Sequence, residues 1–250
     1  MSDGHFRWLH SLPDNTTYAD ATASLKKWNA WDYVSEGIRR ELSRTDRKGA
    51  TFPVADFEST NARTFFIMPE ALGMVPTARN KARQMGLQAH ILYNGYTMTA
   101  EANQVGRIVA GIALTCEQIG EPFAPPIALI AGGELIVTVG QEKGMGGRNQ
   151  EYALAAALVL NNHERVVMGS VDSDGTDGPG HQFVEGYGDV PQLTGGIVDG
   201  STVRRAAELG IDIYTAIKRH DTSPALYKLD DGIIATQSMS MGDLSVTLIL

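Results

Sequence analysis

Near the N-terminus, apolar residues recur at the spacing that is typical of helices. Val34, Ile38 and Leu42 are separated by four positions each, which predicts a helix over residues 31–42. A helix is also expected over residues 18–28, because it follows a polar run suited to capping a helix N-terminus. The first part of the chain is therefore predicted to be helical.

The next part alternates between short apolar runs and longer amphipathic segments. These predict, in order, a strand at 63–68, a helix at 70–85, a strand at 87–93, a helix at 97–119 and a strand at 126–131. Gly86 and Gly120 follow the two helices, where glycine commonly ends a helix. Strands that alternate with helices form parallel sheets covered by those helices. We expect a partial Rossmann-like parallel-sheet layer here.

Prolines at 122, 125 and 126 mark a change in character. Beyond them the pattern predicts a hairpin of 127–130 and 135–139, a helix at 149–160, a strand at 165–169, a Gly/Asp-rich loop at 170–200, a helix at 201–209 and a last strand at 244–250. We therefore predict an α/β fold with two domains. The first, over 1–123, is the partial Rossmann-like domain, and the second, over 124–250, is a smaller mixed α/β domain.

The composition of the chain limits the classes of function that the protein can have. The net charge of −8 argues against a nucleic-acid binder, which usually needs a basic face. Cys116 is the only cysteine, so an intrachain disulfide and a thiolate metal cluster are excluded. Neither a secretory signal nor a long apolar run is visible, so we expect a cytoplasmic protein with no membrane partner.

Two glycine-rich stretches are the first candidate for chemistry. Glycines between a strand and a helix let the backbone approach an anion, and the N–H groups of a helix N-terminus can bind phosphate. An arginine there adds a permanent cation. A hairpin with flexible turns is the alternative interpretation. The residues concerned are Gly132, Gly133, Glu134, Gly146, Gly147, Arg148 and Asn149.

An acidic loop is the second candidate. Asp172, Asp174 and Asp177 lie among small residues after a predicted strand, and oxygen ligands of this kind suit Mg²⁺. A calcium loop is disfavoured because Phe183 stands where the twelfth-position glutamate belongs. An ordinary Asp/Gly turn remains the alternative.

Several segments occur together in a fixed order. They are Thr-Thr-Tyr-Ala-Asp-Ala (16–21), Ala-Glu-Ala-Asn-Gln-Val-Gly (100–106), Gly-Gly-Glu-Leu-Ile-Val-Thr-Val (132–139), Gly-Gly-Arg-Asn-Gln-Glu-Tyr-Ala-Leu (146–154), Asp-Gly-Thr-Asp-Gly (174–178), Gly-Gly-Ile-Val-Asp (195–199) and His-Asp-Thr-Ser (220–223). This ordered set resembles the type-2 glycerate kinases, some of which carry the label hydroxypyruvate reductase. Their C-terminal domain is known as MOFRL.

The resemblance implies a function. Enzymes of this type use ATP with Mg²⁺ to phosphorylate the 2-hydroxyl of D-glycerate in a cleft between two α/β domains. Arg148 would then be catalytic, stabilising the transferring phosphoryl group, and Asp174 and Asp177 would hold metal. The residues implied to bind substrate or nucleotide are Gly132, Gly133, Glu134, Gly146, Gly147, Asn149, Asp174, Asp177, His220 and Ser223.

The chain also departs from this family. The glycine-rich segment and lysine expected in the family's N-terminal half are not found upstream of residue 16. We therefore expect one subunit of a split enzyme, completed by a partner subunit or by a homo-oligomer. A ligand-binding or scaffold subunit without catalysis, a kinase whose own chain suffices and a hydroxypyruvate reductase are the alternatives. The reductase is the weakest of these, because no dinucleotide fingerprint is present.

Overall fold

The computed structural model describes residues 13–46, 50–61, 73–181, 184–235 and 240–250. Contacts within the chain divide it into two compact units, Met1–Ile67 and Met68–Leu250. The strand predicted at 63–68 lies outside the described residues. None of the helices in the described ranges is long and apolar enough to cross a bilayer.

The first unit contains three short helices, α1 (Tyr18–Lys27), α2 (Glu36–Leu42) and α3 (Val54–Glu58). Thr17 and Asp20 form a capping box at the start of α1, which confirms the predicted start of that helix. The helix predicted from residue 31 begins later, because Ser35 caps it, and α3 lies in a stretch for which no element was predicted. No residue of these three helices is buried.

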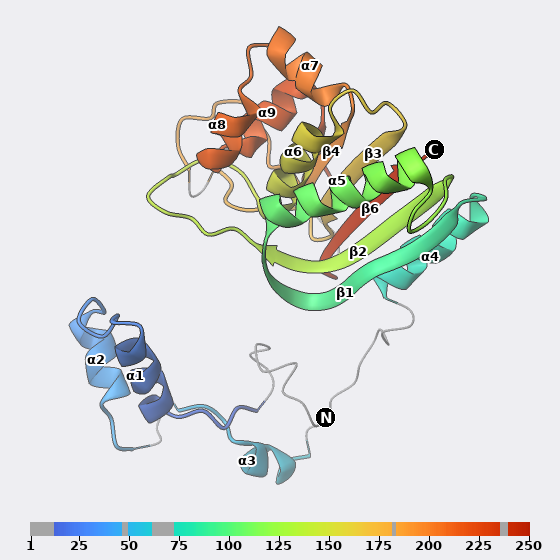
Figure 1. Ribbon diagram of the computed structural model, residues 1–250. Coiled ribbons are helices and arrows are strands. Elements are labelled where there is room, and N and C mark those ends of the chain that lie inside the picture. The colour runs from blue at the N-terminus through green and yellow to red at the C-terminus, as the bar shows by residue number, and fades with distance from the viewer. Residues whose placement is uncertain (1–12, 47–49, 62–72, 182–183, 236–239) are drawn as a thin grey trace. The chain divides into compact units, whose positions relative to one another are not determined.

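The second unit is built on one mixed sheet with the strand order β1-β2-β6-β3-β4-β5 (Figure 1). The strands are β1 (Gln88–Glu101), β2 (Ile127–Ile136), β3 (Val166–Asp172), β4 (Gly195–Asp199), β5 (Gly232–Ile233) and β6 (Asp243–Ile249). β1 and β2 are parallel, as predicted. Every other pairing in this sheet is antiparallel.

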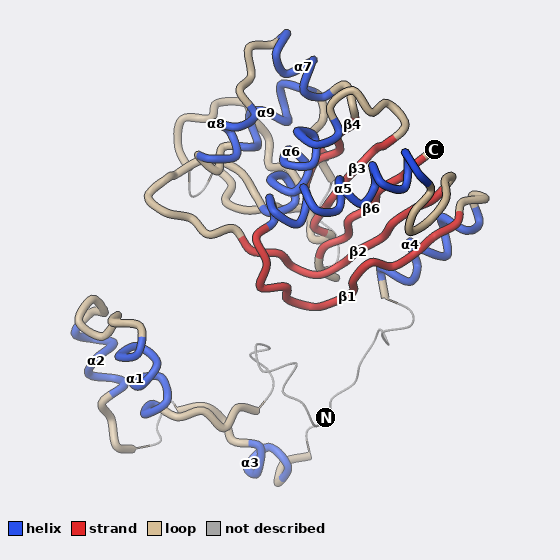
Figure 2. The backbone as a smooth tube through the Cα atoms, viewed as in Figure 1, coloured by secondary structure: helices blue, strands red, loops and turns tan. Residues whose placement is uncertain are grey.

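Helices cover both faces of this sheet (Figure 2). They are α4 (Met74–Gln84), α5 (Ala102–Ile119), α6 (Arg148–Leu160), α7 (Thr202–Glu208), α8 (Ile213–Lys218) and α9 (Thr222–Leu229). Successive residues of β2 point to opposite faces, so Ile127 and Leu129 join the large core that includes α5 and α6, whereas Ala128 and Ile130 pack with α4. The α/β fold class predicted from the sequence is confirmed.

Three local predictions for segments of this sheet are wrong. The helix predicted from residue 97 begins at Ala102, because β1 continues to Glu101 beside β2. The predicted hairpin of 127–130 and 135–139 is replaced by the single strand β2, which pairs with β6 on its other side. The loop predicted at 170–200 contains β4, which pairs with β3. In each case the pairing strand is remote in sequence, so local pattern does not reveal it.

The predicted domain boundary between residues 123 and 124 falls inside the second unit. It lies between α5 and β2, and the strands on its two sides, β1 and β2, pair along most of their lengths. The most pronounced break in contacts lies instead at Ile67–Met68.

Candidate functional site

The site is centred on the first turn of α6. Gly147 precedes this helix, and the next four residues, from Arg148 to Glu151, are polar. Asn149, Gln150 and Glu151 are almost fully buried, with exposed fractions of 3%, 0% and 1%. Buried polar groups need hydrogen-bond partners, and each of these side chains has at least one. The four side chains leave the helix in different directions, so this one turn organises several contacts.

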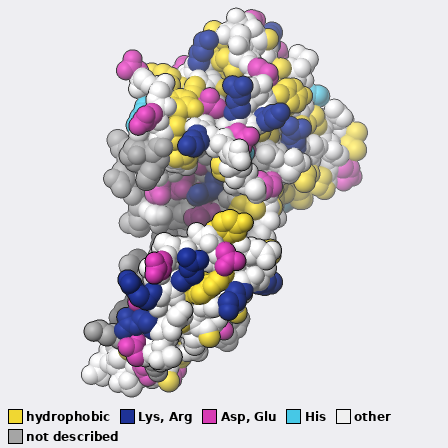
Figure 3. Space-filling model, turned by 90° about the vertical axis from the view of Figure 1, so that its left-hand side faces the viewer, with side chains coloured by type: hydrophobic (Ala, Val, Ile, Leu, Met, Phe, Trp, Pro, Cys, Tyr) yellow, Lys and Arg dark blue, Asp and Glu magenta, His cyan; other side chains and the backbone are white. Residues whose placement is uncertain are grey.

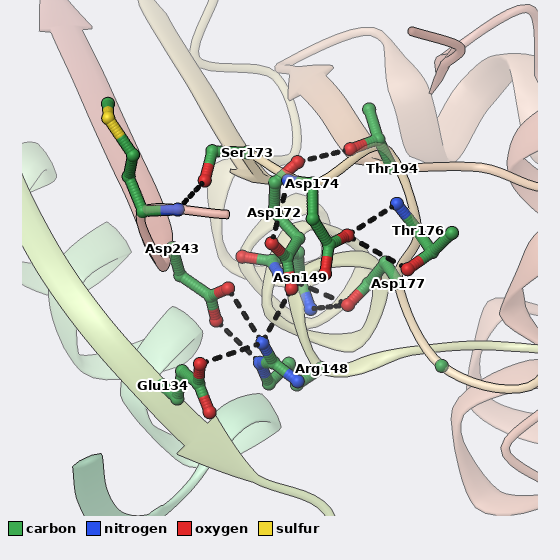
Figure 4. A network of polar contacts seen from close by, with 12 residues as sticks. Glu134, Arg148, Asn149, Asp172, Ser173, Asp174, Thr176, Asp177, Thr194 and Asp243 are labelled. Carbon is green, nitrogen blue, oxygen red and sulfur yellow. Dashed lines mark hydrogen bonds and ion pairs between the residues drawn. The ribbon is translucent and has the colours of Figure 1, made fainter. Parts of the chain in front are cut away.

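Arg148 lies among three carboxylates from three strands (Figure 4). Its Nε is 2.6 Å from Asp243 Oδ2 and its Nη2 is 2.9 Å from Asp243 Oδ1, which makes a bidentate pair. The same Nη2 is 2.7 Å from Asp172 Oδ2. Glu134 Oε1 is farther away, at 3.8 Å. β6, β3 and β2 thus hold the guanidinium in one orientation.

The charges around Arg148 do not balance. One guanidinium faces the carboxylates of Glu134, Asp172 and Asp243, and burial raises the pKa of Asp172. Within the described part of the chain, no hydrogen bond engages Arg148 Nη1, and about a quarter of the side chain is exposed. A guanidinium with one free nitrogen can donate to an incoming anion while its other nitrogens stay fixed.

Asp177 occupies the N-terminus of α6. Its Oδ1 accepts hydrogen bonds from the backbone N–H of Asn149 at 3.2 Å and from Asn149 Nδ2 at 3.1 Å. Its Oδ2 accepts from the backbone N–H of Gln150 at 3.0 Å. Burial raises the pKa of Asp177 to about 6, although these hydrogen bonds lower it. The N–H groups that we expected to bind a phosphate therefore already bind a carboxylate of the same chain.

The two aspartates predicted to hold Mg²⁺ do not come together with further side chains in a ready-made cluster of ligands, and their role as metal ligands stays a prediction. Both oxygens of Asp177 are used by α6, and Asp174 Oδ1 accepts from the backbone and hydroxyl of Thr176. A search of the described residues finds no group of three or more His, Cys, Asp or Glu side chains that could hold a metal ion. The alternative interpretation of this loop, an Asp/Gly turn, fits the geometry better.

The glycines of the candidate site allow the chain to approach itself closely. A Cβ on Gly147 would lie 2.3 Å from Asp177, and one on Gly146 would lie 2.4 Å from Thr222 Oγ1. A Cβ on Gly132 would lie 2.2 Å from Val75, and one on Gly133, which has a φ of 128°, would lie 2.3 Å from the Gly95 carbonyl oxygen. Packing within the chain thus requires these four glycines, whereas nucleotide binding by them stays a prediction.

The remaining two predicted site residues lie at the start of α9, with His220 just before the helix and Ser223 in its first turn. Ser223 is buried and donates to Gln150 Oε1 at 2.7 Å, so its hydroxyl is already used inside the protein. The His220 side chain is about a fifth exposed and pairs with Glu151, with 2.6 Å between Nδ1 and Oε1. The structure therefore gives Ser223 a structural contact and leaves one nitrogen of His220 available.

Pattern analysis missed some of the residues that build the site. Asp243 lies at the start of β6, one residue before the strand predicted at 244–250, and its contact with Arg148 depends on the pairing of β6 with β3. Asp172 was noticed in the acidic loop but was not chosen. Gln150 and Glu151 were visible within the Gly-Gly-Arg-Asn-Gln-Glu segment, which was the available signal.

Comparison with known proteins supplies the family. Residues 127–240 match the model described as the MOFRL family. This part of the chain therefore belongs to the MOFRL family. The chain is 32% identical over 219 residues to a glycerate 2-kinase of Pyrococcus horikoshii, covering 88% of this chain and 46% of that relative. It is 33% identical over 216 residues to a D-glycerate 2-kinase of Thermotoga maritima, covering 86% and 46%.

Solved structures agree with this assignment. The crystal structure of a glycerate kinase from Thermotoga maritima matches with a TM-score of 0.71 and 32% identity, over 96% of this chain and 52% of that one. A putative hydroxypyruvate reductase of Agrobacterium vitis is 29% identical, over 92% of this chain and 48% of that relative. The chain thus spans about half the length of the curated relatives it matches. The resemblance to glycerate 2-kinases found in the sequence is confirmed, and the coverage is consistent with a C-terminal part.

Proposed function

We propose that this chain takes part in ATP-dependent phosphoryl transfer to the hydroxyl of a small hydroxy acid such as D-glycerate. The observation that carries the proposal is Arg148, held by Asp243 and Asp172 with one guanidinium nitrogen free, in a chain similar to glycerate 2-kinases. Phosphoryl transfer depends mainly on positioning and on stabilising charge at the transferring group. A fixed guanidinium with a free donor meets both needs.

The carboxylates give this arginine its catalytic geometry. Asp243 and Asp172 are nearly buried, and they fix Nε and Nη2, so Nη1 would reach the same point in every turnover. A preorganised donor stabilises developing charge without a cost of reorientation. The acidic side chains would also repel a free anion, so binding of ATP here requires further positive charge besides Arg148.

We propose that this further charge comes from the part of the relatives' fold that the described residues do not supply. It would lie on a partner subunit, on a second copy of the chain or elsewhere on the same polypeptide. On the face that Figure 3 shows, acidic and basic side chains of the described residues are interspersed on each unit.

The test is an assay of the full chain, with any partner that purifies with it, for ATP-dependent phosphorylation of D-glycerate. Formation of phosphoglycerate and ADP in equal amounts is the expected result. ATP binding without turnover would favour a ligand-binding or scaffold subunit. Reduction of hydroxypyruvate by a nicotinamide cofactor, with no phosphorylation, would favour the activity named for the Agrobacterium vitis relative.

Mg²⁺ is the metal that the family resemblance implies for such a reaction. Because Asp174 and Asp177 do not come together with further side chains in a ready-made cluster of ligands, we build no step on it. Asp177 instead contributes to the site indirectly, because its hydrogen bonds fix the first turn of α6, which carries Arg148.

A further inference from the structure

A buried carboxylate and a histidine form a pair beside the first turn of α6. His220 Nδ1 lies 2.6 Å from Glu151 Oε1, and the other oxygen, Oε2, accepts from Asn103 Nδ2 at 3.3 Å. Burial raises the pKa of Glu151, whereas the hydrogen bonds from His220 and Asn103 lower it. Within the described ranges, His220 is the only basic side chain that pairs with Glu151. The carboxylate therefore fixes the orientation of the imidazole.

The other ring nitrogen of His220 is open. With Nδ1 donating to the carboxylate, Nε2 carries a lone pair and can accept a proton. None of the described residues hydrogen-bonds to Nε2, and this atom is not among the buried polar atoms that lack a partner. About a fifth of the side chain is exposed. A histidine oriented by a carboxylate, with its second nitrogen accessible, is the arrangement of a general base.

The backbone carbonyl of His220 lies close to Gly144 and Gly146, in the loop that leads to Arg148. His220 has a φ of 55°, a left-handed conformation that few residues other than glycine adopt. A Cβ on Gly144 would lie 2.5 Å from the His220 carbonyl oxygen, and one on Gly146 would lie 2.6 Å from it. Residues held in such a conformation are often found at functional sites.

The pair and Arg148 lie at the same end of α6. Arg148 and Glu151 are three residues apart in this helix, a spacing at which Cβ atoms are about 5–6 Å apart. The charged groups next to His220 are its partner Glu151 and its chain neighbours Arg219 and Asp221, and Glu101 at the end of β1 acts on Glu151 electrostatically.

We propose that His220 is the general base of the phosphoryl transfer and that Glu151 is its positioning residue. Nε2 takes the proton of the substrate hydroxyl while that oxygen forms a bond to the γ-phosphorus of ATP. The bond from this phosphorus to the bridging oxygen breaks, and ADP leaves with the electron pair. Glu151 stabilises the imidazolium, which returns its proton to solvent through the exposed nitrogen. This inference rests on the proposed function.

The test variant is His220→Asn. Asparagine tolerates the left-handed conformation and can donate to Glu151, but its amide cannot accept a proton. We expect kcat for D-glycerate phosphorylation to fall by about 10²–10⁴ with little change in the KM for ATP. The wild-type enzyme should lose activity as the pH falls and His220 becomes protonated, and this acidic limb should be absent in the variant. Glu151→Gln should move the limb to lower pH.

The chain contains a matched control. His163 Nδ1 lies 2.7 Å from Glu117 Oε2, in a similar pair beyond the other end of α6. His163→Asn should leave kcat and its pH profile unchanged. The inference fails if His220→Asn keeps the wild-type kcat and acidic limb, or if the two variants behave alike. A wild-type protein that phosphorylates no D-glycerate at all would overturn the proposed function and this step with it, which is a different outcome.

Discussion

The two ends of α6 are both largely buried but are built from opposite chemistry. The first turn, from Arg148 to Glu151, carries four polar side chains that meet partners on β3, β6, α5 and α9. The later turns carry Ala153, Leu154, Ala155, Ala156, Ala157 and Leu160, all in the large hydrophobic core. One helix is therefore both the centre of the core and the base of the candidate site.

This difference teaches how burial should be interpreted. Apolar residues of the later turns gain stability wherever they are removed from water, because the hydrophobic effect is not directional. Polar residues of the first turn gain nothing from burial unless each hydrogen bond is made. A buried polar turn thus demands a specific arrangement of remote segments. The predictions below test this contrast, and they run from the largest expected effect to the smallest.

Arg148→Lys should have the largest effect on activity. Lysine keeps the charge that Asp172 and Asp243 need but loses the planar fork that binds Asp243 through two nitrogens. We expect turnover to fall by about 10³-fold, which corresponds to about 4 kcal/mol. The measurement is kcat for D-glycerate phosphorylation, with urea unfolding as the check on stability.

Arg148→Ala is the less informative variant. It would leave two nearly buried carboxylates without a cation, which costs about 3–5 kcal/mol in comparable cases. Its loss of activity could not be separated from unfolding. A lysine variant with full turnover would contradict the role proposed for the guanidinium.

Leu154→Ala tests the apolar end of α6. Leu154 is fully buried, and its truncation should lower the free energy of unfolding by about 3 kcal/mol, because it leaves a cavity in the core. The measurement is urea unfolding followed by circular dichroism. The KM and pH profile of the protein that remains folded should match the wild type. A change in either would show that the two ends of α6 are not independent.

Gly147→Ala tests how closely the acidic loop must approach α6. The new Cβ would lie 2.3 Å from Asp177, so the loop must move and the hydrogen bonds to the helix N-terminus must lengthen. We expect a loss of about 1–3 kcal/mol in stability together with reduced turnover. Gly111→Ala is the control, since a Cβ there meets nothing within 4 Å and alanine favours the helix. Equal losses in both variants would contradict this interpretation.

Asp177→Asn should have the smallest effect, visible as a pH dependence. Burial raises the pKa of Asp177 in the folded protein to about 6 from the ordinary value of 3.8, so the folded protein binds the proton more tightly than the unfolded chain does. A raised carboxyl pKa contributes stability that is present below the unfolded pKa and is lost as the pH rises through about 6. The stability of the wild type relative to the variant should therefore fall between about pH 4 and 7, by at most about 3 kcal/mol.

Thermal unfolding of both proteins across that range measures this difference. A rising difference would mean that the N–H groups of Asn149 and Gln150 stabilise the ionised carboxylate more than burial penalises it. That result would show that the ionised Asp177 carboxylate stabilises the N-terminus of α6.

The sequence itself determined some of the helices and the family. The α6 pattern, the cap of α1 and the Gly-Gly-Arg-Asn-Gln-Glu segment are local, and a local pattern can be read without knowing what lies opposite it. The ordered motifs led to the glycerate 2-kinase resemblance that the comparisons confirm. They also pointed to Arg148 as the centre of the site.

Only the tertiary structure decided what surrounds that arginine. β6 comes last in the chain yet lies between β2 and β3, and this insertion brings Asp243 to Arg148 across 95 residues. The same folding fills the helix N-terminus with Asp177 and orients His220 through Glu151. Pairings over such distances depend on which strands become neighbours, and hydrogen-bond partners chosen in this way leave no periodic trace in the sequence.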